Sequence, residues 1–192
     1  ALNITYTPRS FQVYANEFPQ SRYAFVGASI DGRRHEPFEP PEGSGSLVYI
    51  SLGTELNKSE RFFRRCVAAF GSTGMRVVMA IGDSVRPESL GPVPPTMMVR
   101  RRVPQLEVLS RASLFITHGG MNSVNEALFY GVPMLVVPVG NDQPTVARRV
   151  EELGLGEALD IHEATPDVLR EAAMRVLSDR ECHARLSEFR QE

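Results

Sequence analysis

The apolar residues of the chain fall into short continuous runs, and segments with helical periodicity separate these runs. The runs predict buried strands at residues 47–52, 76–81, 96–100, 114–117, 134–137 and 156–160. The intervening and following segments predict helices from Asn57 to about residue 70 and at 105–112, 122–130, 143–153, 166–177 and 179–190. Strands that alternate with helices form parallel βαβ units, and continuous apolar strands indicate a sheet that is covered on both faces. The sequence therefore predicts an α/β fold with a parallel sheet and helices on both faces.

The N-terminal part of the chain has a different organisation. Residues 2–7 and 23–30 predict two further short strands, with a proline-containing loop between them. From residue 31 to residue 46 the composition shifts to charged, proline, glycine and serine residues, which is typical of a linker. The whole chain of 192 residues is 42% hydrophobic and 23% charged, which suits one globular domain with a sizeable core.

Polar and glycine residues gather where the predicted strands end. Five segments, 51–54, 82–83, 100–105, 118–123 and 138–143, each follow a predicted strand. The carboxyl ends of parallel strands lie at one edge of a sheet, and ligands of open α/β sheets bind outside that edge. We therefore expect these five segments to converge on one ligand site.

The most informative of these segments reads HGGMNS and runs from His118 to Ser123. It joins a strand to a helix that is predicted to begin at about Asn122. The first N–H groups of a helix lack internal partners and carry partial positive charge, so they attract anions. Gly119 and Gly120 allow a ligand to approach the backbone, and His118, Asn122 and Ser123 add side-chain donors. This segment therefore predicts an anion site.

Glu126 lies three residues after Ser123, so both side chains can share one helix face. A carboxylate beside an anion site indicates contact with another part of the ligand, and a ribose diol is the natural candidate because a carboxylate accepts from two hydroxyls. Two alternatives stay open. Glu126 can serve the helix dipole alone, or it can close a capping box with Ser123.

Several other classes of site lack their sequence signals. The chain has neither a GxxxxGK[ST] nor a GxGxxG motif, and its four histidines and two cysteines are not at zinc-ligand spacing. No spacing rule makes Asp142 and Glu126 a glycosidase pair, and neither Ser51 nor Ser123 lies in a nucleophile elbow. These observations disfavour a phosphate-binding loop, a structural zinc and a hydrolase.

The net charge and the cysteine content limit which binding partners and which cellular compartment the sequence supports. A net charge of −2 and a pI near 6.1 give no support to a nucleic-acid surface or a polybasic membrane patch. No apolar run is long enough to span a bilayer, and no signal-peptide core appears at the N-terminus. Cys66 and Cys182 are expected to be unpaired thiols, which fits a cytoplasmic protein.

The motifs gain specificity from their order and spacing. Four motifs occur along the chain in the order PQ, HGG-x-NS-x-x-E, GVPM and P-x-x-x-DQ. Together they resemble the donor-binding signature of family-1 nucleotide-sugar glycosyltransferases, which have the GT-B fold. The resemblance is strongest to the bacterial macrolide-type branch, which NITYT at 3–7, FVG at 25–27 and SLGT at 51–54 also resemble. It covers essentially the whole chain. It implies the end of an acceptor domain at residues 1–30, an interdomain linker at 31–45 and a Rossmann-like, C-terminal donor-binding domain at 46–192.

The resemblance also implies a role for each residue that matches the family pattern. Gln105 and Glu126 would bind the nucleoside, Glu126 through the ribose hydroxyls, and the backbone of Val103 would meet the uracil edge. The diphosphate would lie among Ser51, Thr54, His118, Gly119, Gly120, Asn122 and Ser123. The sugar hydroxyls would be held by Asp142 and Gln143. The alternative is that Asp142 only caps the helix that follows and that Gln143 is exposed beside it. Arg102 stands where many relatives carry an aromatic residue that stacks on the base, and its guanidinium plane can also stack.

The reaction implied by the resemblance is inverting transfer from a UDP- or dTDP-hexose to a hydroxyl of a small-molecule acceptor, such as a macrolide. Neither a metal nor another cofactor is implied. The general base of the family is a histidine near the start of the acceptor domain, so the present chain is expected to bind donor without turnover. Two other interpretations stay open: a non-catalytic nucleotide-binding module, and a peptidoglycan-type N-acetylglucosaminyltransferase or an epimerase of the same fold.

Overall fold

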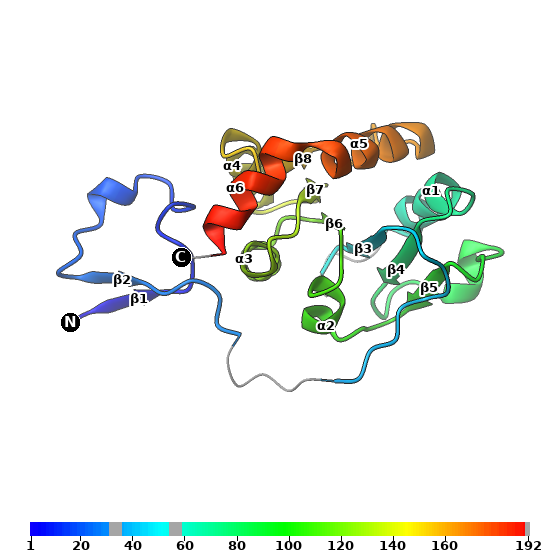
Figure 1. Ribbon diagram of the computed structural model, residues 1–192, viewed down its shortest axis with the longest axis horizontal. Coiled ribbons are helices and arrows are strands. Elements are labelled where there is room, and N and C mark those ends of the chain that lie inside the picture. Colours follow the sequence, from blue (N-terminus) through cyan, green and yellow to red (C-terminus); the bar gives the residue numbers. More distant parts are fainter. Residues whose placement is uncertain (31–35, 54–58, 191–192) are drawn as a thin grey trace.

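The computed structural model describes residues 1–30, 36–53 and 59–190. Its central sheet has six strands, which are β3 (Leu47–Ser51), β4 (Arg76–Ala80), β5 (Met97–Arg100), β6 (Leu114–Thr117), β7 (Met134–Val136) and β8 (Gly156–Ala158). Their order is β5-β4-β3-β6-β7-β8, and every neighbouring pair is parallel (Figure 1). The predicted parallel α/β sheet is confirmed.

The strand order reverses between β3 and β6. From β3 the chain builds outward through β4 and β5, and it then returns to the other side of β3 to add β6, β7 and β8. Ser51 at the end of β3 lies in register with Thr117 at the end of β6. In doubly wound sheets the crevice at such a reversal is where ligands bind. The topology therefore identifies the carboxyl ends of β3 and β6 as the place where a ligand is expected to bind.

Helices cover both faces of the sheet. They are α1 (Glu60–Phe70), α2 (Gln105–Leu109), α3 (Met121–Tyr130), α4 (Gln143–Glu152), α5 (Pro166–Ser178) and α6 (Arg180–Phe189). The apolar residues of α1 and α5 form one core cluster, and those of α2, α3, α4 and α6 form the other. Strand β3 contributes alternate side chains to the two clusters, with Val48 and Ile50 in the first and Leu47 and Tyr49 in the second. The helices thus bury the sheet from both sides, as the continuous apolar strands predicted.

Helix α1 begins later than the sequence suggested. Its N-cap is Ser59, whose Oγ accepts a hydrogen bond from the backbone N–H of Phe62 at 3.3 Å. Asn57, at which the sequence predicted the start of this helix, lies outside the described residues. The other prediction about this helix concerned Cys66, which is buried and free, as is Cys182 of α6.

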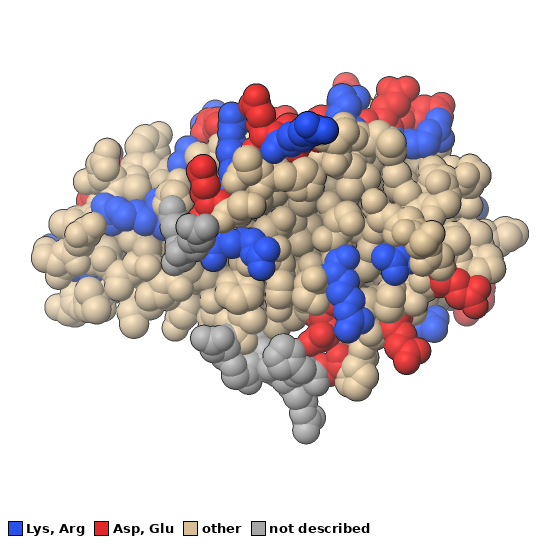
Figure 2. Space-filling view, viewed as in Figure 1, with Lys and Arg blue, Asp and Glu red and all other residues tan. Residues whose placement is uncertain are grey.

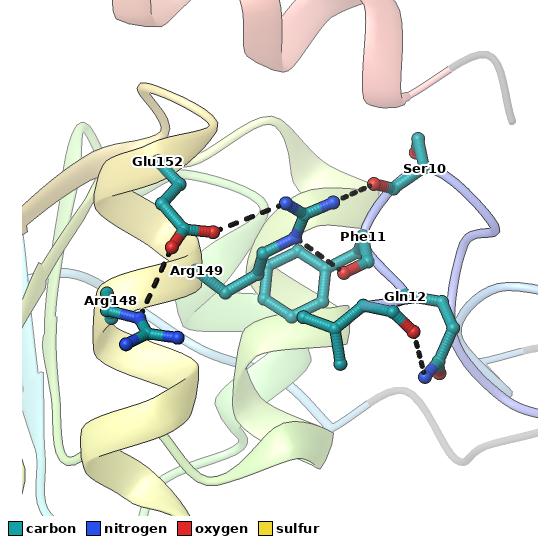
Figure 3. Close-up of polar contacts among 7 residues, drawn as sticks. Ser10, Phe11, Gln12, Arg148, Arg149 and Glu152 are labelled. Carbon is teal, nitrogen blue, oxygen red and sulfur yellow. Dashed lines mark hydrogen bonds and ion pairs between the residues drawn. The ribbon is translucent and has the colours of Figure 1, made fainter. Parts of the chain in front are cut away.

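The first 30 residues pack beside α3 and α4 (Figure 1). They form the parallel strands β1 (Asn3–Thr5) and β2 (Tyr23–Phe25) and the 3₁₀ helix η1 (Ala15–Glu17), while a second 3₁₀ helix, η2 (Pro87–Leu90), precedes β5. Arg149 of α4 donates to the backbone oxygens of Ser10 and Phe11, at 2.9 Å each (Figure 3). The ring of Phe11 is buried in the second core cluster. The division of the chain at residues 30 and 45 stays a prediction.

A second attachment joins this segment to α3. Asn125 is buried, and its Nδ2 donates to the backbone oxygen of Tyr6 at 2.6 Å and to Oγ1 of Thr7 at 3.1 Å. Buried amides need such partners, because an unpaired polar group in the core is costly. The segment is therefore held by polar contacts as well as by apolar packing.

Charged side chains on the face shown in Figure 2 gather along its upper edge, over α4, α5 and α6, with both signs interspersed. The chain carries exposed ion pairs, such as Arg148 of α4 with Glu152 and Arg175 of α5 with Glu157. Each such pair contributes at most about 1 kcal/mol to stability. Among the described helices, none combines the length and the apolar character that a membrane span requires.

Candidate functional site

A cavity of about 570 Å³ opens at the carboxyl ends of β3, β4 and β6. Eight residues that the sequence assigned to the site line it: Ser51, Arg102, Val103, Gln105, His118, Gly120, Asn122 and Ser123. Five other lining residues, Gly53, Gly82, Asp83, Arg101 and Met121, lie in the segments that were expected to converge here, whereas no site role was predicted for Tyr49 and Ala80. Thr54 lies outside the described residues. The cavity thus gathers the segments that follow several strands at the point where the strand order reverses.

The N-terminus of α3 faces this cavity. The helix begins at Met121, one residue earlier than predicted, and its N-cap is Gly120, which provides no side-chain hydrogen bond to the first turn. The first three residues of the helix all line the cavity. Gly119 has a φ of +86°, and a side chain there would come within 2.8 Å of Val136, so this position requires glycine. The turn therefore presents helix N–H groups at the cavity wall.

The imidazole of His118 lies between two glycines. A Cβ atom at Gly53 would lie 2.8 Å from Nε2 of His118, and a Cβ atom at Gly120 would lie 2.6 Å from it. Real Cβ atoms are essentially never so close to another heavy atom. Glycine at both positions therefore creates the space that the ring occupies.

Burial favours the neutral form of the His118 imidazole by lowering its pKa, and the carboxylate of Asp142 opposes this shift. Its Nδ1 atom is buried and has no hydrogen-bond partner within the described parts of the chain. A neutral imidazole carries one donor and one acceptor nitrogen, so this ring can donate a hydrogen bond to an anion without supplying a full charge.

Glu126 is only 4% exposed and is not among the residues that line the cavity. Nε2 of Gln105 donates to Oε2 of Glu126 at 2.5 Å and to Oγ of Ser123 at 3.2 Å. Because the N-cap is Gly120 and the first turn of α3 carries no acidic residue, the capping-box and helix-dipole alternatives for Glu126 are both wrong. The structure therefore brings the two predicted nucleoside-binding side chains together.

Arg102 and Asp83 form an exposed ion pair at the mouth of the cavity. Nη2 of Arg102 lies 2.7 Å from Oδ2 of Asp83, and both residues line the cavity. They follow the neighbouring strands β5 and β4, which explains why residues 19 positions apart in sequence meet. The guanidinium is thus held beside Val103, the residue that was assigned to the base.

Asp142 and Gln143 lie at the start of α4 and do not line the cavity surface described above. Asp142 is exposed, and its side chain makes no capping hydrogen bond to α4. Gln143 is 4% exposed, and its Oε1 accepts from the backbone N–H groups of Val139 and Gly140, at 2.8 and 3.1 Å. The alternative that Asp142 caps the helix while Gln143 is exposed is therefore wrong in both parts.

Helix α4 starts beside the HGG turn. A Cβ atom added to Gly119 would lie 3.6 Å from the backbone oxygen of Gln143, which is ordinary contact. The start of α4 therefore lies close to the turn that precedes α3. The described residues contain no group of three or more histidine, cysteine, aspartate or glutamate side chains that is arranged to hold a metal.

The chain matches one family and many known proteins. Residues 64–192 match the model of the erythromycin biosynthesis protein CIII-like C-terminal domain. The chain is 45% identical over 181 residues to the NDP-glycosyltransferase YjiC of Bacillus licheniformis, covering 93% of this chain and 46% of that protein. It is 37% identical to the oleandomycin glycosyltransferase of Streptomyces antibioticus, covering 96% of this chain and 44% of that protein.

A solved structure agrees with these sequence matches. The crystal structure of the calicheamicin glycosyltransferase CalG4 superposes with a TM-score of 0.90 at 36% identity, covering 99% of this chain and 48% of that one. The chain therefore spans about half the length of the proteins that it matches.

Proposed function

The chain belongs to the erythromycin biosynthesis protein CIII-like C-terminal domain family of glycosyltransferases, and from this premise we propose that its cavity binds the donor, a UDP- or dTDP-hexose. One observation carries the proposal. The start of α3 lines the cavity at the reversal of the strand order, and the buried carboxylate of Glu126 is joined to the cavity lining by its hydrogen bond from Gln105. A nucleoside diphosphate needs both, because its phosphates accept hydrogen bonds and its ribose hydroxyls donate them.

Each part of the donor has a proposed place. The diphosphate lies against the N-terminus of α3, His118 and Ser51, and the ribose lies over Glu126 and Gln105. The base meets the backbone of Val103 and the guanidinium plane of Arg102, which Asp83 orients. The sugar extends toward the start of α4, where Asp142 and Gln143 bind its hydroxyls. In this arrangement neutral and dipolar donors, without a metal, meet the diphosphate charge.

The proposed reaction is displacement of the nucleoside diphosphate by an acceptor hydroxyl, with inversion at the anomeric carbon. Negative charge develops on the leaving diphosphate, and the preorganised N–H groups of α3 and the His118 ring stabilise it. The hydroxyl must lose its proton to a general base, which we assign to an acceptor domain outside this chain. We therefore expect the chain alone to bind donor without transferring the sugar.

The acceptor class is proposed from the relatives. The matched proteins are named as an NDP-glycosyltransferase, an oleandomycin glycosyltransferase and a calicheamicin glycosyltransferase. These names favour transfer to a natural product over an epimerase or a peptidoglycan-type transferase of the same fold. Sugar transfer by a full-length protein would separate an enzyme from a non-catalytic nucleotide-binding module.

Calorimetric titration of the chain with UDP, dTDP and their glucose conjugates tests donor binding directly. We expect saturable binding of one ligand per chain, with the same affinity in the presence and absence of a metal chelator, because the proposed site meets the diphosphate with N–H and imidazole donors. A loss of binding in chelator would contradict the metal-free site. No binding of any of the four ligands would contradict the proposed function itself.

Asp142→Ala should change sugar recognition and little else. The side chain is exposed and caps nothing, so its loss should leave the melting temperature and the UDP affinity nearly unchanged, within about twofold for the affinity. The additional affinity for UDP-glucose over UDP should fall, because a carboxylate that accepts from sugar hydroxyls is gone. Asp167→Ala, an exposed carboxylate in α5 on the other face of the sheet, is the matched control. Unchanged selectivity would remove Asp142 from the sugar site.

A further inference from the structure

The floor of the cavity contains a buried tyrosine that the donor-binding roles above leave without a task. Tyr49 lies in β3 and is 1% exposed. Its ring stacks on Phe115 of the neighbouring strand β6, with 4.7 Å between ring centroids and 7° between the ring planes. Two rings so arranged, on paired strands in a close-packed core, leave the tyrosine little freedom. The position of its hydroxyl is therefore fixed by the sheet.

The hydroxyl of Tyr49 donates to Oε1 of Gln105 at 2.9 Å. Burial raises the pKa of this hydroxyl far above its ordinary value, a hydrogen bond with Ser51 opposes the shift, and the charge of Glu126 adds to it. The group therefore stays protonated and remains a donor at every pH at which the protein would be used.

This hydrogen bond holds the oxygen end of the Gln105 amide in place, and the Glu126 carboxylate, which only accepts, requires the nitrogen end to face it. An amide has an oxygen end that accepts and a nitrogen end that donates. With the oxygen end bound to Tyr49, the nitrogen end faces Oε2 of Glu126 and Oγ of Ser123, at 2.5 and 3.2 Å. The reversed amide would place its oxygen against the Glu126 carboxylate, where two acceptors repel. The chain of contacts therefore runs from the sheet through the amide to the carboxylate.

We propose that Tyr49 is a positioning residue for the ribose, because its hydroxyl fixes the Gln105 amide and, through that amide, the carboxylate of Glu126. The inference rests on the proposed function. It assigns to β3 a role in nucleotide recognition beyond that of a core strand. The hydroxyl also hydrogen-bonds with Ser51, which belongs to the proposed diphosphate site, so a relay through Gln105 requires that removal of the hydroxyl weaken the ribose contacts and leave the diphosphate contacts unchanged.

Tyr49→Phe tests this relay, because phenylalanine keeps the stacked ring and removes only the hydroxyl. The variant should bind UDP about 3- to 10-fold more weakly than the unchanged chain, the range expected for one buried hydrogen bond. Its affinity for 2′,3′-dideoxy-UDP should change by less than about twofold, because that ligand has no hydroxyls for Glu126 to bind. Tyr23→Phe, in β2 and away from the cavity, is the matched control and should change neither affinity.

The outcomes separate the relay from the proposed function. No UDP binding by the unchanged chain would contradict the proposed function. If the unchanged chain binds UDP, an equal loss for both ligands in Tyr49→Phe, or no loss for either, would overturn the relay. In the Gln105→Ala background Tyr49→Phe should cost no further UDP affinity. A further loss there would show that the hydroxyl acts by another route and would also overturn the relay.

Discussion

Gly120→Ala should weaken UDP binding by about 10- to 150-fold, the loss expected when a hydrogen bond to a charged group is removed. The added methyl group would lie 2.6 Å from Nε2 of His118, so the imidazole must leave its position. The backbone of Gly120 is in the extended region, with φ −64° and ψ 133°, which alanine adopts without strain. The effect therefore reaches the ligand through the displaced ring, and calorimetric titration with UDP measures it.

Two further variants isolate the displaced ring as the cause. Gly140→Ala is the matched control, because a Cβ atom at Gly140 meets nothing within 4 Å, and UDP affinity should stay within about twofold. His118→Ala should lose about as much affinity as Gly120→Ala, and the double variant should lose no more than His118→Ala alone. Alanine is a poorer N-cap than glycine, so a stability loss of about 1 kcal/mol is expected for Gly120→Ala. If Gly120→Ala bound UDP with an affinity close to that of the unchanged chain, the His118 ring would not be needed for binding the diphosphate.

The second large effect is expected at Glu126. Glu126→Ala should weaken UDP binding by about 1–3 kcal/mol, because charged hydrogen bonds to the ribose are lost and Nε2 of Gln105 loses its strongest partner. Binding of 2′,3′-dideoxy-UDP should weaken much less. The comparison of the two ligands by calorimetry is the measurement.

The Glu126→Gln variant distinguishes a loss of ribose contacts from a loss of folding stability. Glu126 is buried, so alanine leaves a cavity, whereas glutamine keeps the volume and one carbonyl acceptor. The glutamine variant should retain the melting temperature more closely and still lose affinity for UDP more than for the dideoxy ligand. Equal losses for the two ligands in both variants would show that Glu126 supports the fold and does not contact the ribose.

Local patterns predicted most of the sheet and helices but not their arrangement. Continuous apolar runs identify the strands because both faces of β3 and its neighbours are buried, which leaves no polar alternation. The reversal between β3 and β6 depends on contacts between residues far apart in sequence, so no local pattern contains it. The start of α1 was predicted at Asn57 because Glu60 stands three residues later, as in a capping box, whereas Ser59, the actual N-cap, has Phe62 at that spacing and so lacks the pattern.

The residues of the site, like the elements of the fold, could be predicted from the sequence only in part. Residues in motifs that follow strands, such as His118 and Gln105, could be assigned from the sequence because their spacing carries the signal. Tyr49 could not, since in a buried strand it reads only as another apolar position, and its hydroxyl gains a partner when α2 packs beside β3. Asp83 belongs to a segment that was expected at the site, but its pairing with Arg102 could not be predicted, because Arg102 follows the next strand of the sheet.

The attachment of the first 30 residues to α3 and α4 bears on how hybrid proteins should be assembled from this family. A hybrid that exchanges donor halves by joining two parents after Ile30 would bring Ser10 and Phe11 from one parent and Arg149 from the other. Thr7 and Asn125, two buried side chains that hydrogen-bond to each other, would also come from different parents. A crossover placed before Asn3 keeps these partners together. The natural unit for recombination is thus longer than the donor-binding fold itself.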